Sequence, residues 1–266
     1  MLRLSSAIIE KAKTLGASLA GLACVDDLKK APSSFTFAHQ FVAADSGAGG
    51  RQEGALKDTP GKVTWSEDAK SVLVIAVEHP ADKPEMDWWF DVADPPGNRL
   101  LARIITDLCA WIEQSNGIRT FHMPYQVEKG GTYLKDVSVL AGLGCIGKNN
   151  LLVTPEYGPR VRLRALTLDA YFPATGPINF DPCIGCDAPC RHACPQNAFN
   201  CRGYEMEACG QNRLPGRNGV YSRPMCTIQM DKDIAVAEEI RIRRFGKPVK
   251  IIKYCRCCEF ACPVGK

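Results

Sequence analysis

The chain has 266 residues, enough for one large domain or two modest ones that each bury a hydrophobic core. Hydrophobic residues make up 45% of it and charged residues 23%, proportions that exclude a disordered, collagen-like or coiled-coil protein. The formal net charge of +4 arises from 33 basic and 29 acidic residues and is too small to indicate a general polyanion-binding protein.

The first predicted element is an amphipathic helix. Apolar residues recur at helical spacing from Leu4 to Leu15, and Gly16 ends the pattern. The charged residues within this segment argue against a secretory signal. The longest apolar runs, such as residues 71–77, are far shorter than the about 18 residues needed to cross a bilayer. We therefore expect a cytoplasmic protein with no membrane partner.

Predicted strands and helices are then mixed up to about residue 168. Asn98 is expected to cap a long helix that Gly117 ends, and residues 32–62 are expected to form a long loop or lid. The strands are predicted at 19–25, 71–77, 118–123, 151–154 and 161–168, and the helices at 98–117 and 134–141. This mixture predicts an α/β or α+β layer domain.

Three glycines and a lysine form a GxGxxGK motif at Gly142, Gly144, Gly147 and Lys148. A dinucleotide-binding turn needs a strand before it and a helix after it, whereas a helix precedes this motif and prolines follow it. A Walker A loop would need Ser or Thr after the lysine. Two interpretations remain: a helix C-cap with a tight turn that serves packing, or bare backbone that approaches a large flat cofactor.

Cysteine is the strongest signal in the sequence. Of 14 cysteines, 11 lie between residues 183 and 266, and this shift in composition indicates a second domain. We place the domains at residues 1–175 and 176–266. Because no export signal is present, ligation of a metal or cluster by thiolates is favoured over a disulfide scaffold.

The spacing of these cysteines predicts two 4Fe–4S clusters. Both CIGCDAPCRHACP and CRCCEFACP resemble the ferredoxin run CxxCxxCxxxCP, whose last cysteine ligates the other cluster. The first run carries one extra residue, which predicts a bulged loop. By this crossing rule, one cluster would be held by Cys183, Cys186, Cys190 and Cys262.

The second cluster would be held by Cys194, Cys255, Cys258 and one further cysteine. Cys226 is the first candidate for that further ligand and Cys209 the second, ahead of Cys201 and Cys257. Zinc is the main alternative to clusters, because four thiolates also suit a structural zinc site.

The segment LKDVSVLAGLGCIGKNNLLVTPEYGPRVRL, followed by the two cysteine runs, resembles the epoxyqueuosine reductase family, whose relatives include the reductive dehalogenases. The resemblance covers most of the chain from about Gly130 onward. It implies a nitroreductase-like domain that binds cobalamin with its lower base detached, followed by a ferredoxin-like domain whose two clusters deliver electrons to cobalt. It also implies that the cobalamin is lined by Ala141, Gly142, Leu143, Gly144, Cys145, Ile146, Gly147, Lys148, Asn149, Tyr157, Gly158 and Arg160.

The chain departs from the family pattern at several positions. The family's proton donor is an aspartate where this chain has Glu128, so the resemblance makes Glu128 and the nearby Asp136 the candidate acids. The family's tryptophan within AGLGWIGK is replaced by Cys145. The helical repeats that read transfer RNA in epoxyqueuosine reductases are expected to be absent, since the sequence stops at Lys266.

The resemblance implies a cobalamin-dependent reductase of a small or nucleoside-like substrate, with reduced ferredoxin or flavodoxin as electron donor. The alternative is an electron-transfer protein or a reductive activator of a partner corrinoid protein, and a flavin is a weaker candidate for the cofactor. Residues 241–256 contain seven Lys or Arg and predict either a docking face for an acidic protein or nucleic acid, or a solvated face. Residues 88–90 predict either a roof over a planar cofactor or ordinary core.

Overall fold

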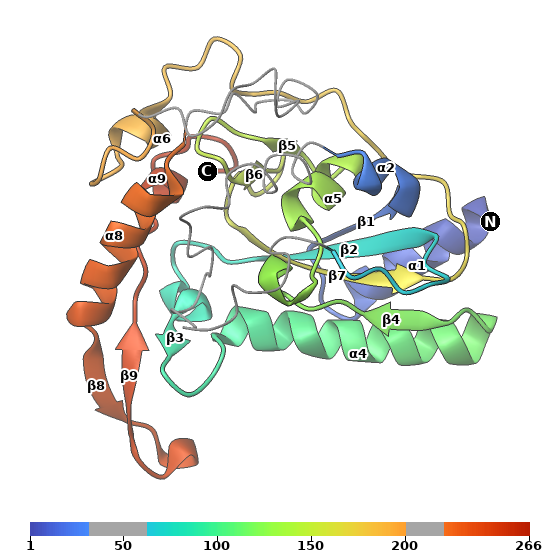
Figure 1. Cartoon of the computed structure of the whole chain (residues 1–266), viewed down its shortest axis with the longest axis horizontal. Coiled ribbons are helices and arrows are strands. Elements are labelled where there is room, and N and C mark those ends of the chain that lie inside the picture. Colours follow the sequence, from blue (N-terminus) through green and yellow to red (C-terminus); the bar gives the residue numbers. More distant parts are fainter. Residues whose placement is uncertain (32–62, 201–220) are drawn as a thin grey trace.

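The computed structural model describes residues 1–31, 63–200 and 221–266 (Figure 1). The loop or lid predicted at residues 32–62 lies outside the described residues, as do Cys201 and Cys209. Among the helices of the described part, none combines the length and the apolar character that crossing a bilayer requires.

A four-stranded antiparallel sheet forms the centre of the fold. Its strands are β1 (Leu19–Cys24), β2 (Ser71–Glu78), β7 (Val161–Leu168) and β4 (Thr120–His122), in the order β1-β2-β7-β4. The predicted strand at 71–77 is buried along its whole length, because β2 is a central strand covered on both faces. Side chains of a strand alternate between the faces, so Leu73 and Ile75 enter one core cluster while Val72 and Val74 enter the other.

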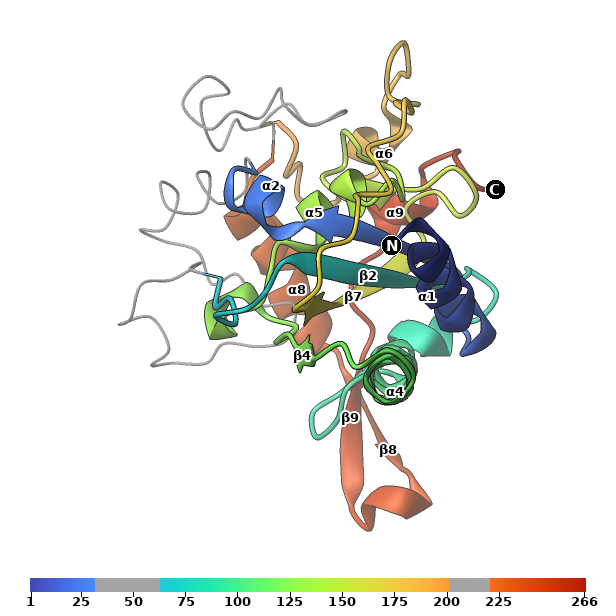
Figure 2. The ribbon, with the colours of Figure 1, turned by 90° about the vertical axis from the view of Figure 1, so that its right-hand side faces the viewer.

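Helices cover both faces of this sheet (Figures 1 and 2). On one face lie α1 (Leu2–Thr14) and α4 (Pro96–Asn116), whose buried residues join the cluster around Leu73. On the other lie α2 (Val25–Lys29) and α5 (Leu134–Leu140), which contribute to the cluster around Val72. The predicted mixed α/β class is therefore confirmed.

The predicted cap of the long helix is wrong. α4 begins at Pro96 with Pro95 as its N-cap, a position where proline's missing N–H costs no hydrogen bond. Asn98 lies inside the helix, where its buried side chain accepts a hydrogen bond of 2.9 Å from Arg162. The other end agrees with the prediction, because Gly117 adopts a left-handed conformation with φ of 66°.

Short elements connect the sheet to the C-terminal part. They are η2 (Pro84–Asp87), β3 (Trp89–Phe90), η3 (Val127–Lys129), and the two-stranded β5 (Cys145–Ile146) and β6 (Leu152–Val153). The strand predicted at 151–154 is thus only two residues long. The C-terminal part contains α6 (Pro189–His192), α8 (Arg223–Ala235), β8 (Glu238–Arg241), η5 (Arg243–Phe245), β9 (Pro248–Ile252) and α9 (Cys257–Phe260).

A second sheet, in the order β3-β9-β8, connects the two regions for which we predict separate domains. β3 comes from the first region and pairs through Trp89 and Phe90 with Ile252 and Ile251 of the second. The β8–β9 hairpin extends away from the body of the molecule (Figures 1 and 2). Its base is therefore fixed to the first region while its tip projects.

Candidate metal centre

Four of the predicted ligands line one pocket. They are Cys183, Cys186, Cys190 and Cys262, and the pocket is completed by Lys148, Asn149 and several prolines and aliphatic residues. Cys190 belongs to α6, and Cys262 follows α9, which packs against α6. The structure thus brings the last cysteine of the second run to the first three cysteines of the first run.

Backbone N–H groups point at the sulfur atoms of this first set. Lys148 N donates to Cys183 Sγ over 3.4 Å, and Ala188 N donates to Cys186 Sγ over 3.4 Å. Ala188 lies in the extra length of the first run and adopts a φ of 54°, which forms the bulge there. Hydrogen bonds to sulfur stabilise negative charge on a thiolate and tune the potential of a cluster bound to it.

The second predicted set is also gathered, around Cys258. Burial raises the pKa of the Cys258 thiol, and the negative charges of Cys255, Cys226 and Cys194 raise this pKa further. Cys226 lies on α8 and is half-buried, whereas Cys255 and Cys257 are both exposed to solvent. Ala198 N donates to Cys194 Sγ over 3.3 Å. The structure thus groups Cys226 with the three cysteines that the crossing rule assigns to the second set.

Burial raises the pKa of several of these thiols. Burial raises the pKa of Cys190 to about 11, and the charges of Cys262 and Cys183 contribute to this shift. Burial likewise raises the pKa of Cys183, against the opposing effect of the hydrogen bond from Lys148 N–H. Since the thiolate is the ligand form, a metal must displace protons when it binds. Within the described residues, no group of three or more His, Cys, Asp or Glu side chains is arranged to hold a single metal ion.

The segment from Ala141 to Asn149 lies mostly inside the protein. Most of its residues are buried, and Leu143 and Ile146 belong to the core on the α5 side of the sheet. Gly144 packs so tightly that a Cβ there would lie 2.0 Å from the carbonyl oxygen of Val153. The space beside Gly142 is filled in the same way by the backbone of residues 175–176. These contacts favour the packing interpretation of the glycine motif.

The predicted cofactor residues on the next loop contact the C-terminal turn. Arg160 is buried, and its guanidinium donates to the carbonyl oxygen of Val264 over 2.5 Å and to that of Glu259 over 3.5 Å. Tyr157 N donates to Thr154 Oγ1 over 3.1 Å. In this arrangement Arg160 holds both sides of the turn that carries Cys262.

Gly158 provides a direct test of how this loop packs against the C-terminal turn. Replacing it with alanine is expected to displace the C-terminal turn, because φ is 55° and the new Cβ would lie 2.0 Å from the carbonyl oxygen of Val264. Gly117→Ala is the matched control, since Gly117 also has a positive φ, 66°, but has nothing within 4 Å. Thermal unfolding should show a loss of about 1 kcal/mol for the control and several times more for Gly158→Ala. Equal losses would contradict a role for the close contact.

The two candidate acids lie on separate elements. Asp136 is fully buried within α5. Glu128 belongs to η3, and its side chain is outside the described part of the structure. Asp136 is not among the described residues that line the pocket of the first set.

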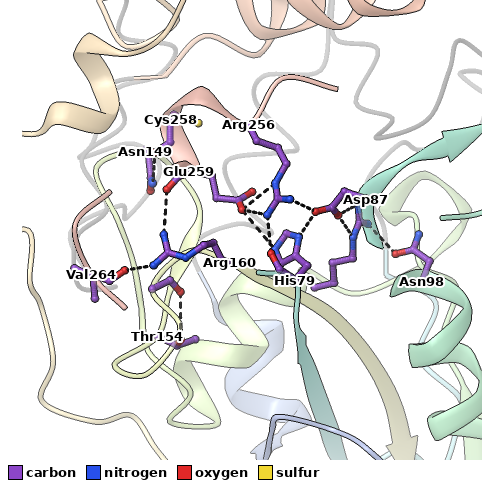
Figure 3. A network of polar contacts seen from close by, with 12 residues as sticks. His79, Asp87, Asn98, Asn149, Thr154, Arg160, Arg256, Cys258, Glu259 and Val264 are labelled. Carbon is purple, nitrogen blue, oxygen red and sulfur yellow. Dashed lines mark hydrogen bonds and ion pairs between the residues drawn. The ribbon is translucent and has the colours of Figure 1, made fainter. Parts of the chain in front are cut away.

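A buried ionic network that the sequence analysis missed lies beside the second set (Figure 3). Its centre is Asp87, whose carboxylate contacts His79 Nδ1 at 2.5 Å, Arg256 at 2.6 Å and the guanidinium of Arg162. Arg256 also pairs with Glu259 and donates to the carbonyl oxygen of His79 over 2.8 Å. Arg256 stands between Cys255 and Cys257 in the chain, so this network fixes the turn that carries part of the second set.

The network keeps the Asp87 carboxyl ionised. Burial raises its pKa, but the hydrogen bond and charge of His79 and the charges of Arg162 and Arg256 outweigh burial, so that the pKa lies below its ordinary value. The position of Arg256 between Cys255 and Cys257 marks it in the sequence as a residue close to the proposed ligands. Its partners His79 and Asp87 are far away in the sequence and carry no local signal.

The aromatic residues 88–90 form part of the joint between the two regions. Trp89 makes an edge contact with Tyr254 at 6.2 Å, and Phe90 contacts Phe245 at 5.7 Å between ring centroids. Lys253 Nζ lies 5.1 Å from the centre of the Trp88 ring. Residues 88–90 are half-buried in this joint and belong to neither of the two hydrophobic core clusters.

Comparisons with known proteins agree with the resemblance seen in the sequence. No protein-family model matches the chain. The epoxyqueuosine reductase of Lactococcus garvieae (strain Lg2) is 27% identical over 210 residues, which are 75% of this chain and 53% of that protein. An epoxyqueuosine reductase of Bacillus cereus is 39% identical over 73 residues, 27% of this chain and 19% of that protein.

Solved structures extend the likeness to nearly the whole chain. A crystal structure of epoxyqueuosine reductase covers 99% of this chain and 66% of its own, with a TM-score of 0.62 and 21% identity. The chain has the epoxyqueuosine reductase fold. The Bacillus subtilis epoxyqueuosine reductase also gives a TM-score of 0.62, with 21% identity, over 100% of this chain and 66% of its own. The reductive dehalogenase NpRdhA gives 0.50, with 20% identity, over 74% of this chain and 25% of its own.

The chain therefore spans about half the length of the Lactococcus garvieae epoxyqueuosine reductase that it matches, and about two thirds of the solved epoxyqueuosine reductase structures. The predicted resemblance to epoxyqueuosine reductases, with reductive dehalogenases as more distant relatives, is confirmed at the level of the fold.

Proposed function

We propose that the chain is an iron–sulfur oxidoreductase of the epoxyqueuosine reductase type, in which two 4Fe–4S clusters supply electrons to a corrinoid that reduces a small or nucleoside-like substrate. The observation that carries this proposal is the grouping of eight cysteines into two sets on an epoxyqueuosine reductase fold. Iron–sulfur clusters bound by cysteine thiolates carry one electron at a time, and their reduction potentials in proteins span about −700 to +450 mV.

The donor sets fit clusters better than zinc. Four thiolates around zinc each lie about 2.3 Å from one ion. The first set instead follows the ferredoxin crossing rule, because the last cysteine of the second run lines one pocket with three cysteines of the first run. We assign Cys183, Cys186, Cys190 and Cys262 to the first cluster, and Cys194, Cys226, Cys255 and Cys258 to the second.

The chain's own residues prepare these sites. The N–H groups of Lys148 and Ala188 donate to sulfur in the first set and would stabilise its negative charge. Lys148 Nζ donates to the carbonyl oxygen of Cys186 over 2.9 Å, and Arg191 Nε donates to that of Lys148 over 2.9 Å. These bonds attach the segment that carries Cys186 and Arg191 to Lys148 of the glycine motif.

Gly142 and Gly144 pack against the chain's own backbone, so a corrin does not fit directly on these two glycines. We therefore derive no chemical step through cobalamin. The same observation favours the second candidate, an electron-transfer protein or reductive activator whose corrinoid belongs to a partner. One epoxyqueuosine reductase structure contains an epoxyqueuosine-modified tRNA stem loop, which makes a nucleoside within RNA the first substrate class to test.

Elemental analysis of anaerobically purified protein tests the proposal. We expect about eight iron and about eight sulfide per chain, together with the broad visible absorption of iron–sulfur clusters. A chain that holds zinc and no sulfide would refute the clusters. Cobalamin added to the same sample separates the two candidates: a shifted cobalamin spectrum supports a reductase, and no binding supports the electron-transfer protein. Yellow, fluorescent flavin released on denaturation would contradict the corrinoid.

A further inference from the structure

We propose that the projecting β8–β9 hairpin is the docking surface for a small acidic electron-carrier protein, which reduces the second cluster. This inference rests on the proposed function, because it requires a cluster to be reduced. Each encounter moves one electron: the carrier is oxidised and the second cluster is reduced, with no bond made or broken.

The outer part of the hairpin carries positive charge. Residues 241–247 contain four basic and no acidic residues. Arg241, Arg243, Lys247 and Lys250 are exposed, and none of them forms an ion pair with another described residue. Lys253, nearer the base, is paired with Glu238 at 3.0 Å. These four cations are therefore exposed on the hairpin, without an ionic partner in the part of the chain that the structure describes.

Along the chain, the hairpin lies between Cys226 and Cys255, two proposed ligands of the second cluster. α8, which carries Cys226, leads into β8, and Cys255 is the third residue after the end of β9. Three residues span at most about 11 Å, so the base of the hairpin lies within that distance of Cys255. Cys255 is itself exposed. A protein that binds along the hairpin is thus brought to the solvent-facing side of the second cluster.

The surroundings favour a protein over a nucleic acid. Val236, between α8 and β8, is 79% exposed, and Ile228 on α8 is 43% exposed. Glu238 and Glu239 are exposed at the base of the same hairpin. These carboxylates repel a phosphate backbone and an acidic protein alike, so the apolar side chains distinguish the two partners: a protein can bury them and a phosphate backbone cannot. Protein interfaces commonly combine an apolar centre with a charged rim.

Charge reversal at the tip tests the proposal. In anaerobic stopped-flow experiments, reduction of the wild-type clusters by a reduced acidic ferredoxin should slow as salt is added, because opposite charges accelerate the encounter. In R241E/K247E this rate should fall by about tenfold or more at low salt. R3E/K30E, the same charge change on exposed residues of the first region, should leave it unchanged. Reduction by dithionite and by reduced viologen should be similar in all three proteins.

The outcomes separate the two proposals. If reduced ferredoxin reduces R241E/K247E as fast as it reduces R3E/K30E, the docking surface is overturned. The proposal of two clusters is unaffected by that result. Loss of tRNA stem-loop binding in R241E/K247E with unchanged reduction by ferredoxin would assign the surface to RNA and also overturns it. A wild-type chain without iron–sulfur absorption refutes the proposed function, and the docking inference with it.

Discussion

Replacing Cys226 with serine is expected to remove one of two clusters and to lower the iron content from about eight to about four per chain. The reason is the position of Cys226, whose charge acts on Cys258 together with those of Cys255 and Cys194. The remaining iron should retain a cluster spectrum, because the four thiols in the pocket of the first set are untouched. Iron and sulfide analysis with electron paramagnetic resonance of the reduced protein measures both effects.

Cys257→Ser is the matched control for this experiment. Cys257 lies in the same cysteine run, but it is not among the charges that act on Cys258. We expect its replacement to leave about eight iron per chain. If Cys257→Ser loses a cluster and Cys226→Ser does not, our assignment of the ligand is wrong. If neither does, one of the two cysteines outside the described residues is the ligand.

Asp87→Asn is expected to destabilise the protein by about 3–5 kcal/mol, because it leaves two buried guanidinium groups without their shared carboxylate. The unfolding midpoint in denaturant measures this loss. Asp68→Asn removes an exposed carboxylate that pairs with Arg119 at 2.6 Å and should cost at most about 1 kcal/mol. Similar losses in the two variants would show that the network is not a major source of stability.

The same network predicts a dependence on pH. The pKa of Asp87 in the folded protein is below the ordinary value of 3.8, so its ionised form stabilises the fold above that pH. This contribution is lost as the pH falls through the lowered pKa. The stability difference between wild type and Asp87→Asn should therefore be full at pH 7 and should shrink below about pH 4. A difference that persists unchanged at pH 3 would contradict this assignment.

Some features could be predicted because their signals are local. The uniform apolar run from Ser71 to Val77 identifies a central strand, and the helical period before Gly117 identifies α4. The ferredoxin spacing, with its rule that the last cysteine crosses over, anticipates that Cys262 lies near the cysteines of the first run. In each case the pattern within a short stretch of sequence is sufficient to predict the structural feature.

Other features depend on partners far apart in the sequence. Nothing near Asp87 indicates that it meets Arg256, and nothing near Asn98 indicates that it accepts a hydrogen bond from Arg162. The glycine motif was ambiguous because both of its interpretations require bare backbone, and only the contacts of Gly144 with β6 distinguish them. The β8–β9 hairpin was missed although Val249 and Ile251 alternate with Lys250, because the basic residues dominate that stretch.

The crossing of Cys262 back to the pocket of Cys183, Cys186 and Cys190 also bears on how the protein matures. At about 5–20 residues per second, a ribosome needs on the order of ten seconds to add residue 262 after residue 190. During that interval the first set lacks Cys262 and has only its three other sulfur donors. Iron delivered to this site before translation has finished would find an incomplete cage, so cluster insertion at this site has to wait until the polypeptide is synthesised through Cys262.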